Sequence, residues 1–579
     1  MHPLRSFLRY LLGSLCLLPL SLGAQVPTDL YLQTSDVNDL LTHYKADRGN
    51  LRRFYFVDNS PEARERFRVL HNDYLARLGT LDYNRMNVGS RVDYLLLKRD
   101  LQDALRQLTV EEQEMAKLQP WFPFADKIYE IEKQRRRGTT LNAPEVAQTL
   151  NDINQQLIQL REKLAQEKGL EANLGFRAVG TTEGLRKALK SVYEFYNEYD
   201  PAFSWWVPTP YHHTDSLLAS LGTLLNKKIE AGPSGQKDPS GIVGRPVGRE
   251  ELIRQLQYEM IPYTPEELID LANQEFAWCD RELLKASREM GFGDNWRQAM
   301  EKVKNTYVPA GKQPEMIMGL YNESMEFLKK HDLITIPPIA EETWRMIMMT
   351  PKRQLVNPFF TGGEVLSISY PTQGMAHDDK LMSMRGNNPH FSRATVHHEL
   401  IAGHHLQFFM NNRYKTYRDF RTPFWTEGWA LYWELLLWDL GFPQSPEDRI
   451  GMLFWRSHRC ARILFSLNYH LGRWTPQQCI DFLVDRVGHE RANAEGEVRR
   501  SFAGGYGQLY QLAYLTGGLQ LYALKKELVD SGKMTYKQFH DAVMHENALP
   551  IEYLRAILTN QVLPPHYQTS WRFYEVKRK

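Results

Sequence analysis

Apolar residues recur at intervals of three and four along most of the chain, the spacing that places them on one face of an α-helix. After Thr264 they fall at Leu268, Leu271, Phe276 and Leu283. A later stretch repeats this spacing with Leu453, Phe454, Ala461, Leu464 and Leu467. The hydrophobic pattern therefore predicts a mainly α-helical protein.

Residues that cap helix N-termini mark where several of these helices begin. Thr264 is followed by Pro-Glu-Glu, which combines a capping box with proline at the first helical position. Ser445 and Thr475 are also followed directly by proline, and Asn142 is followed by Ala-Pro-Glu. We therefore expect helices to begin at these four positions.

Strand-like sequence is rare. Residues 364–370 (EVLSISY) form the best example, set off by glycines before them and a proline after them. Such a strand could pair through its backbone with an extended peptide, as edge strands do. Alternatively, it could form a small structural hairpin. The sequence thus predicts one small β element in a large multi-helix fold.

One stretch has the composition of a boundary between regions. Residues 232–248 are rich in glycine, proline and serine, which is typical of a loop or linker. We therefore expect an N-terminal helical region over 25–245 and a C-terminal helical region over 246–579.

Residues 1–24 have the pattern of a secretory signal peptide, with two arginines before an apolar run over 10–22 and small residues near Ala24. The run is shorter than the ~20 residues that cross a membrane, although an uncleaved anchor is the alternative. Lipidation of Cys16 is not expected, because Leu15 precedes it where a small residue is needed. The sequence predicts an exported protein, periplasmic or secreted, with no membrane span in the mature chain.

Composition narrows the possible partners. Hydrophobic residues make up 42% of the chain and charged residues 24%, as in ordinary globular proteins. The formal net charge is only +2, so nothing favours a nucleic-acid partner. Cys279, Cys460 and Cys479 are too few for a disulfide scaffold. Cys460 and Cys479 could pair, or all three could be small buried hydrophobes.

A cluster of histidines carries the candidate chemistry. Residues 397–405 read HHELIAGHH, and Glu427 follows 23 residues after His404 in the run EGWALYWE. A catalytic zinc ion takes three protein ligands through N, O or S and keeps one position open. We expect His398, His404 and Glu427 to bind Zn²⁺, with Glu399 as the base toward the attacking water.

The spacing of these histidines is unusual. His404 lies six residues after His398, and a straight helix would place the two on different faces because each residue turns it by about 100°. His405 returns to the same face but lies about 10 Å further along the axis. A bulge or break at Gly403 could absorb the difference. His404 is therefore the expected ligand and His405 its alternative.

Glu434 is a second carboxylate on the expected helix of Glu427, seven residues further on. It is the alternative ligand, or it accepts a hydrogen bond from a ligand histidine. A histidine cluster can also be a helix surface without function, but the adjacent Glu399 and the downstream EGWA favour a metal site. His470 and His540 are expected to be structural.

These motifs resemble a known family. HELIAGHHLQ, over 398–407, resembles the signature of the bacterial domain-of-unknown-function 885 family, which reads roughly H-E-x-x-P-G-H-H-x-Q. Residues 427–434 look like its second signature, and the similarity runs over most of the mature chain. Ala402 stands where the family has proline. The family in turn resembles helical zinc peptidases of the gluzincin type, which implies a metallopeptidase-like fold.

Two shorter stretches are similar to other zinc peptidases. Residues 426–430 (TEGWA) are similar to the E-G-F-A segment of aminopeptidase N relatives, whose glutamate binds zinc. Residues 503–506 (AGGY) are similar to a loop of the thimet oligopeptidase family, and this implies that Tyr506 stabilises the oxyanion. Ser501 is near the position at which that family has a histidine. A hydroxyl or cation beside the carbonyl oxygen lowers the barrier to hydrolysis, and nearby alternatives are Tyr510, Tyr514 and Arg500.

The sequence thus predicts an exported zinc-dependent metallopeptidase that hydrolyses short peptides. One alternative is a zinc hydrolase of another amide or ester. Another is a non-catalytic envelope protein that binds peptides or metal. Glu399 favours an enzyme, because a binding protein has no need of a base. The sequence leaves the oligomeric state open.

Overall fold

The computed structural model describes residues 34–167, 169–232, 238–354, 359–369, 371–418 and 420–577. Helices dominate these residues, and the predicted mainly α-helical class is confirmed. The predicted signal peptide and Cys16 lie outside the described residues.

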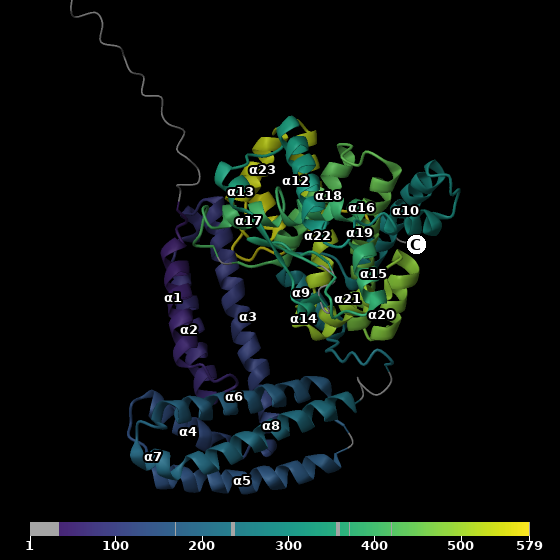
Figure 1. The fold of residues 1–579 in the computed structure, drawn as a ribbon. Coiled ribbons are helices and arrows are strands. Elements are labelled where there is room, and N and C mark those ends of the chain that lie inside the picture. Colours follow the sequence, from purple (N-terminus) through teal and green to yellow (C-terminus); the bar gives the residue numbers. More distant parts are fainter. Residues whose placement is uncertain are drawn as a thin grey trace, which may run out of the picture.

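Three long helices stand between a small helical bundle and a large helical body (Figure 1). These are α1 (Asn38–Phe54), α2 (Pro61–Gly79) and α3 (Val88–Leu118), with 3₁₀ turns at Tyr83–Arg85 and Gln119–Trp121. The bundle comprises α4 (Ala125–Arg136), α5 (Ala143–Gln166), α6 (Ala172–Tyr196), α7 (Pro201–Trp206) and α8 (Pro208–Glu230).

The body contains the remaining elements. Its first half comprises α9 (Gly248–Tyr258), α10 (Pro265–Glu289), α11 (Trp296–Lys304), α12 (Gln313–Lys330), α13 (Pro338–Thr343), β1 (Arg345–Met348), α14 (Pro351–Gln354), β2 (Val365–Ile368) and α15 (His377–Gly386). Its second half comprises α16 (Pro389–Glu399), α17 (His404–Asn411), α18 (Pro423–Asp439), α19 (Pro446–His470), α20 (Pro476–Phe482), α21 (Arg491–Ala503), α22 (Tyr510–Lys525), α23 (Tyr536–His545) and α24 (Ile551–Leu558), with π-helical turns at Leu483–Val487 and Lys526–Asp530.

The described residues form two separate hydrophobic cores. The smaller core lies in the bundle and includes Phe124, Leu157 and Leu221. The larger core fills the body and also takes in residues from α1, α2 and the first part of α3. Helices α1 to α3, which stand between the bundle and the body, contribute residues to the larger core, while α4 to α8 form most of the smaller one (Figure 1). The predicted N-terminal region over 25–245 therefore contributes to both cores.

The predicted helix starts are confirmed. Asn142, Thr264, Ser445 and Thr475 are the N-caps of α5, α10, α19 and α20, and each side chain accepts a hydrogen bond from a backbone N–H of the first turn. Thr264 and Thr475 form complete capping boxes. These signals were readable because a cap and its partner lie within three residues of each other.

The small β element is a parallel pair. β2 lies within the predicted 364–370 and pairs with β1, with Val365 opposite Arg345. β1 and β2 do not form a hairpin with each other, since parallel strands need a crossover connection. Ser367 of β2 also forms an antiparallel bridge with Thr361, so a short hairpin-like pairing is present on that side. The pair lies beside the histidine cluster, because a Cβ on Gly362 would meet a carboxylate oxygen of Glu399 at 2.3 Å.

The three cysteines are buried and free, so Cys460 and Cys479 do not pair. The Sγ of Cys479 instead lies 3.7 Å from the backbone carbonyl of Phe465, as a weak S–H donor can. All three cysteines are small members of the larger core.

The crossing of α18 and α22 depends on glycine. A Cβ on Gly517 of α22 would lie 2.0 Å from the carbonyl oxygen of Phe424, and one on Gly428 of α18 would lie 2.6 Å from the carbonyl carbon of Gly517. No side chain fits at such distances from backbone atoms. The glycines therefore let the two helices approach closely, and this sets the position of Glu427 relative to α22.

We predict that Gly517→Ala lowers the free energy of unfolding of the body by about 2–3 kcal/mol, because the added methyl overlaps backbone atoms. The matched control is Gly319→Ala on α12, where a Cβ would meet nothing within 4 Å. That change should be neutral or stabilise by up to about 1 kcal/mol. Urea unfolding followed by tryptophan fluorescence reports on the body directly, since three fully buried tryptophans lie on α18. Equal midpoints for the two variants would contradict the packing argument.

Candidate metal centre

The helix that carries the first histidines breaks where the spacing requires it. α16 ends at Glu399 and α17 begins at His404, with a turn between them. The peptide bond between Ile401 and Ala402 in this turn is cis. A Cβ on Gly403 would lie 1.8 Å from the carbonyl oxygen of His398. Glycine is needed here for space rather than for a positive φ, since its φ is −81°.

The break brings three predicted residues together. His398, His404 and Glu427 each offer one ligand atom, and these atoms lie within 4.8 Å of one another. The Nε2 atoms of His398 and His404 lie 3.6 and 3.2 Å from the Oε2 atom of Glu427. All three residues are buried. Two imidazole nitrogens and one carboxylate oxygen are a donor set that zinc takes in catalytic sites, so the residues fit the predicted ion.

Glu434 lies behind this cluster rather than in it. Its Oε1 atom is 2.7 Å from the Nδ1 atom of His398 and 3.0 Å from a guanidinium nitrogen of Arg459. A carboxylate in this place fixes the ring orientation of the histidine and leaves Nε2 facing the cluster. Burial alone would raise the pKa of Glu434, but Arg459 and His398 lower it to about 2. The structure thus places Glu434 in the supporting role and Glu427 in the cluster.

His405 points away from the cluster. Its Nε2 atom lies 3.0 Å from the backbone carbonyl of Ala340, on α13. His404 is held from the opposite direction, because its Nδ1 atom lies 3.4 Å from the side-chain oxygen of Gln407. The two adjacent histidines therefore have different surroundings, and only His404 faces Glu427.

Electrostatics within the cluster favour a charged Glu427. Burial opposes ionisation of this carboxyl, but His404 and His398 hold its pKa well below the usual value. Burial likewise opposes the charged form of His404, but Glu427 raises the pKa of His404 to about 9. The cluster thus presents a charged carboxylate beside two imidazole rings.

Glu399 occupies a dry position at the end of α16. Burial is the main cause that raises the pKa of its carboxyl, and the charge of Glu427 acts in the same direction. Gly362 lies against this carboxylate, and any larger residue there would overlap it. The side chain is thus confined between the β element and the cluster.

Tyrosines of α22 and of the preceding loop complete the surroundings. The Tyr510 hydroxyl donates a hydrogen bond to the Oε1 atom of Glu427. The Tyr506 ring lies 4.4 Å from that of Tyr510, centroid to centroid. The Tyr514 ring is stacked parallel to that of His398 at 6.0 Å. The candidate tyrosines therefore gather on one side of the cluster, and Tyr510 is the one that contacts Glu427 in the structure.

A second buried group of ion pairs lies next to Glu434 and Arg459. The sequence did not predict it. The Nε atom of Arg462 lies 2.7 Å from the Oε1 atom of Glu497, and Arg500 lies 2.7 Å from the other oxygen. The guanidinium groups of Arg459 and Arg462 lie 4.8 and 4.2 Å from the ring centroid of Tyr514. A signal was present in the sequence, because arginines recur every three residues at 456, 459 and 462 on α19, between apolar residues that predict a buried helix.

Two further histidines lie away from the cluster. His540 is within 2.8 Å of the Tyr432 hydroxyl and 2.7 Å of the Leu333 carbonyl, so both ring nitrogens have partners. His470 is buried at the end of α19, and burial lowers its pKa to about 4. Both have the surroundings of structural histidines.

Glu427, one of the three cluster residues, lines a cavity of about 1160 Å³. Glu427 and Tyr510 line one wall, and residues of α3 and α9 line the opposite one. A cavity of this volume can hold an extended ligand of several residues, since pockets for small molecules measure about 300–1,000 Å³. Among the described residues, the candidate metal centre is thus buried but has access to a large space.

Fold and site together define a mainly α-helical protein with a buried cluster of two histidines and one glutamate beside a large cavity. The chain belongs to the family described as "Bacterial protein of unknown function (DUF885)", whose model matches residues 50–558. The family membership expected from the motifs is thereby confirmed. No curated protein matches the chain.

Two solved structures share this fold. One is a "putative lipoprotein of unknown function" from Shewanella oneidensis, with 15% identity, a TM-score of 0.66 and coverage of 91% of this chain and 100% of that one. The other is a "putative lipoprotein" from Colwellia psychrerythraea, with 15% identity, a TM-score of 0.57 and coverage of 90% and 98%. Within the part of the chain that the structure describes, no helix combines the length and apolarity that crossing a bilayer requires.

We predict that the purified protein binds about one zinc ion per chain and that His398→Ala and His404→Ala abolish this binding, because each removes one of three ligand atoms. His405→Ala is the matched control, since this neighbouring histidine faces Ala340 instead. Elemental mass spectrometry after dialysis measures the stoichiometry. Loss of zinc in His405→Ala, with retention in His404→Ala, would overturn the assignment.

Proposed function

We propose that the protein is an exported zinc-dependent metallopeptidase that hydrolyses short peptides. The observation that carries the proposal is the buried group of His398, His404 and Glu427, with Glu399 next to it in the chain and a large cavity beside it. This is the arrangement that metal-assisted amide hydrolysis requires. The signal-peptide pattern and the lipoprotein descriptions of the two similar structures support export.

A zinc ion held here would act as a Lewis acid and activate water at neutral pH. His398, His404 and Glu427 would hold it, while Glu434 and Arg459 keep His398 oriented. Glu399 would accept the proton of the attacking water and pass it to the leaving amine. Its dry surroundings suit this task, because burial raises the pKa of the carboxyl above its usual value and so makes it a better acceptor for the proton of water.

Tyr506 is proposed to donate a hydrogen bond to the developing oxyanion. It lies in the glycine-rich loop before α22, and its ring packs on Tyr510, which contacts Glu427. A donor near the cluster, on a segment that can adjust to a bound peptide, suits the stabilisation of a transition state.

We predict that Glu399→Gln keeps zinc but lowers kcat for peptide hydrolysis by at least about 10³-fold, because the amide cannot take a proton from water. The control is Glu495→Gln, the same change at an exposed position on α21. A peptide library followed by mass spectrometry identifies substrates, and metal content is measured on the same samples. Undiminished turnover in Glu399→Gln would exclude this mechanism.

We predict that Tyr506→Phe lowers kcat by about 10²-fold and leaves KM nearly unchanged, since the hydrogen bond would form only in the transition state. Tyr510→Phe tests the neighbouring hydroxyl and should act through zinc affinity, because Tyr510 contacts the ligand Glu427. Steady-state kinetics in saturating zinc separate the two effects. If only Tyr510→Phe lowers kcat under these conditions, Tyr510 rather than Tyr506 has the proposed role.

A further inference from the structure

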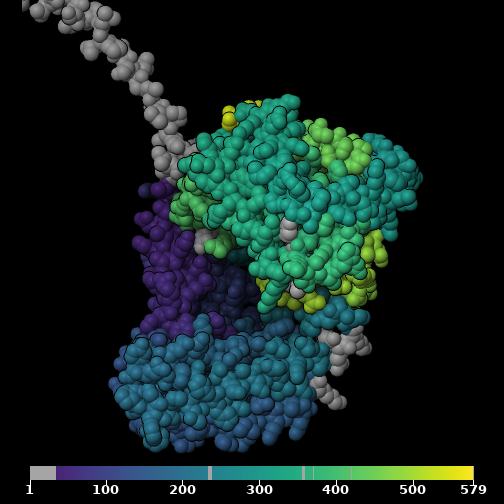
Figure 2. Space-filling view, viewed as in Figure 1, coloured from purple at the N-terminus to yellow at the C-terminus, as the bar shows by residue number. Residues whose placement is uncertain are grey.

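A second cavity of about 980 Å³ lies between the three long helices, the bundle and the body. Its lining residues come from α1, α2, α3 and α6 and from the segment that leads into α9. Figure 2 shows the molecule hollowed between the bundle and the body, beside α1 to α3 in purple. We call this space the basic compartment, for the charges described below.

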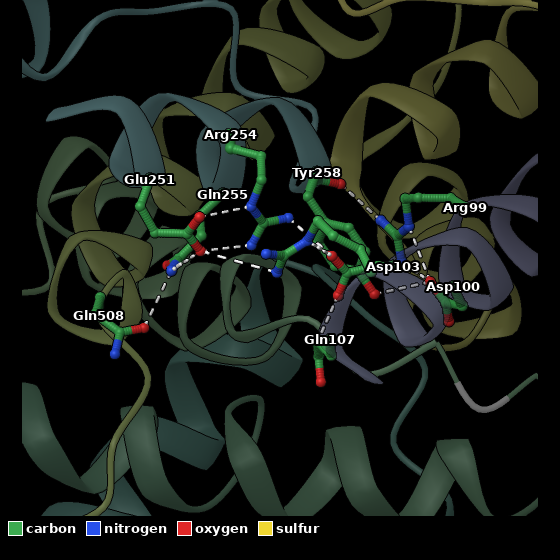
Figure 3. Close-up of polar contacts among 10 residues, drawn as sticks. Arg99, Asp100, Asp103, Gln107, Glu251, Arg254, Gln255, Tyr258 and Gln508 are labelled. Atoms are coloured by element: carbon green, nitrogen blue, oxygen red, sulfur yellow. Dashed lines mark hydrogen bonds and ion pairs between the residues drawn. The ribbon is translucent and has the colours of Figure 1, made fainter. Parts of the chain in front are cut away.

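The basic compartment adjoins the cavity at the metal centre. Both are lined by Arg106, Gln107, Glu251, Gln255 and Gln508. Figure 3 shows most of these residues meeting in one polar network that joins α3, α9 and the loop before α22. A ligand that extends from Glu427 across this network therefore enters the basic compartment.

The network between the two spaces is electrically balanced. Arg254 donates two hydrogen bonds to the carboxylate of Glu251, at 2.8 and 2.7 Å, and a third to Asp103 at 2.8 Å. Arg106 also donates to Asp103, at 3.0 Å. Gln255 bonds both Glu251 and Gln508. Two acidic and two basic groups thus satisfy one another, so this network neither attracts nor repels a charged ligand strongly.

The basic compartment carries excess positive charge. Seven basic and four acidic side chains line the whole compartment, including Arg106 and Glu251 of the network. Glu111 and Glu114 are already paired, with Arg64 at 2.9 Å and Arg177 at 2.7 Å. Among the described residues, no carboxylate lies within ion-pair distance of Arg52, Lys187 or Arg245, which are three of the other cations that line the compartment.

These cations lie on separate walls of the same space. Arg52 comes from α1, Lys187 from α6, and Arg245 from the segment before α9. Arg245 donates a hydrogen bond to the side chain of Asn173 at 3.0 Å, and the charges of Glu114, Arg177 and Glu171 also act on it. Cations that converge from three walls, in a compartment whose basic side chains outnumber its acidic ones, attract a ligand of opposite charge.

We propose that the basic compartment binds a carboxylate of the peptide substrate, so that the preferred substrates carry a negative charge some residues from the scissile bond. This inference rests on the proposed function, because the ligand is a peptide that also reaches the metal centre. Guanidinium groups suit carboxylates since they donate paired hydrogen bonds in one plane. The carboxylate is either the C-terminus or an acidic side chain.

The test measures binding apart from turnover. Fluorescent peptides of one length, with free or amidated C-termini and with glutamate or glutamine at successive positions, are titrated into the Glu399→Gln protein and followed by anisotropy. Peptides with a carboxylate in reach should bind about tenfold more tightly than their neutral counterparts, and added salt should reduce the difference. The amidated and glutamine-substituted peptides distinguish the two sources of the carboxylate.

A matched pair of variants locates the effect. Arg52→Gln combined with Arg245→Gln should remove the tenfold preference and leave the affinity for neutral peptides unchanged. Arg53→Gln is the control, because Arg53 is the exposed neighbour on α1 but does not line the compartment. In active protein the double variant should raise KM for the charged peptide only, with kcat unaffected.

The outcomes separate this inference from the proposed function. Equal binding of charged and neutral peptides, or an equal loss in Arg53→Gln, would overturn the inference even if peptides are hydrolysed. A carboxylate preference that disappears in the double variant supports it, and does so even if the wild-type protein hydrolyses none of these peptides. In that case the peptidase proposal alone would fail.

Discussion

The structure depends above all on the need to satisfy charge in a dry interior. Several carboxylates are buried at the centre of the body, and burying an ion without a partner costs several kcal/mol. Each has cationic or imidazole partners from a different helix, so helices far apart in sequence must meet at fixed distances. These carboxylates are Glu427, Glu434 and Glu497. The position of the candidate metal centre follows from this requirement.

The close packing of α18 and α22 brings buried carboxylates next to their partners on another helix. α18 is buried along nearly its whole length and carries two of the buried carboxylates, while α22 carries the tyrosines that face them. Gly428 and Gly517 bring the helices close enough for Tyr510 to contact Glu427. The small residues of the EGWA motif thus have a packing role, whereas the glutamate has the electrostatic one.

What could be predicted from the sequence was local. The helix starts at Thr264 and Ser445 were readable because their signals span three or four residues. The choice between His404 and His405 could not be settled from the sequence, because it depends on the path of a four-residue turn. β1 has no strand pattern of its own and exists through its pairing with β2. Arg459 could not be placed next to Glu434, because only the packing of α19 brings them together.

The two cores have a mechanical consequence for the cleft. The metal cluster and the basic compartment's far wall belong to bodies with separate interiors, joined by α3 and by the segment before α9. α3 has 31 residues and spans about 46 Å, so a small bend in it moves the bundle by a large amount. Such a bend would change the width of the basic compartment without repacking around Glu427. Admission of a ligand and the chemistry performed on it are governed by different parts of the chain, and each can change in evolution while the other is preserved.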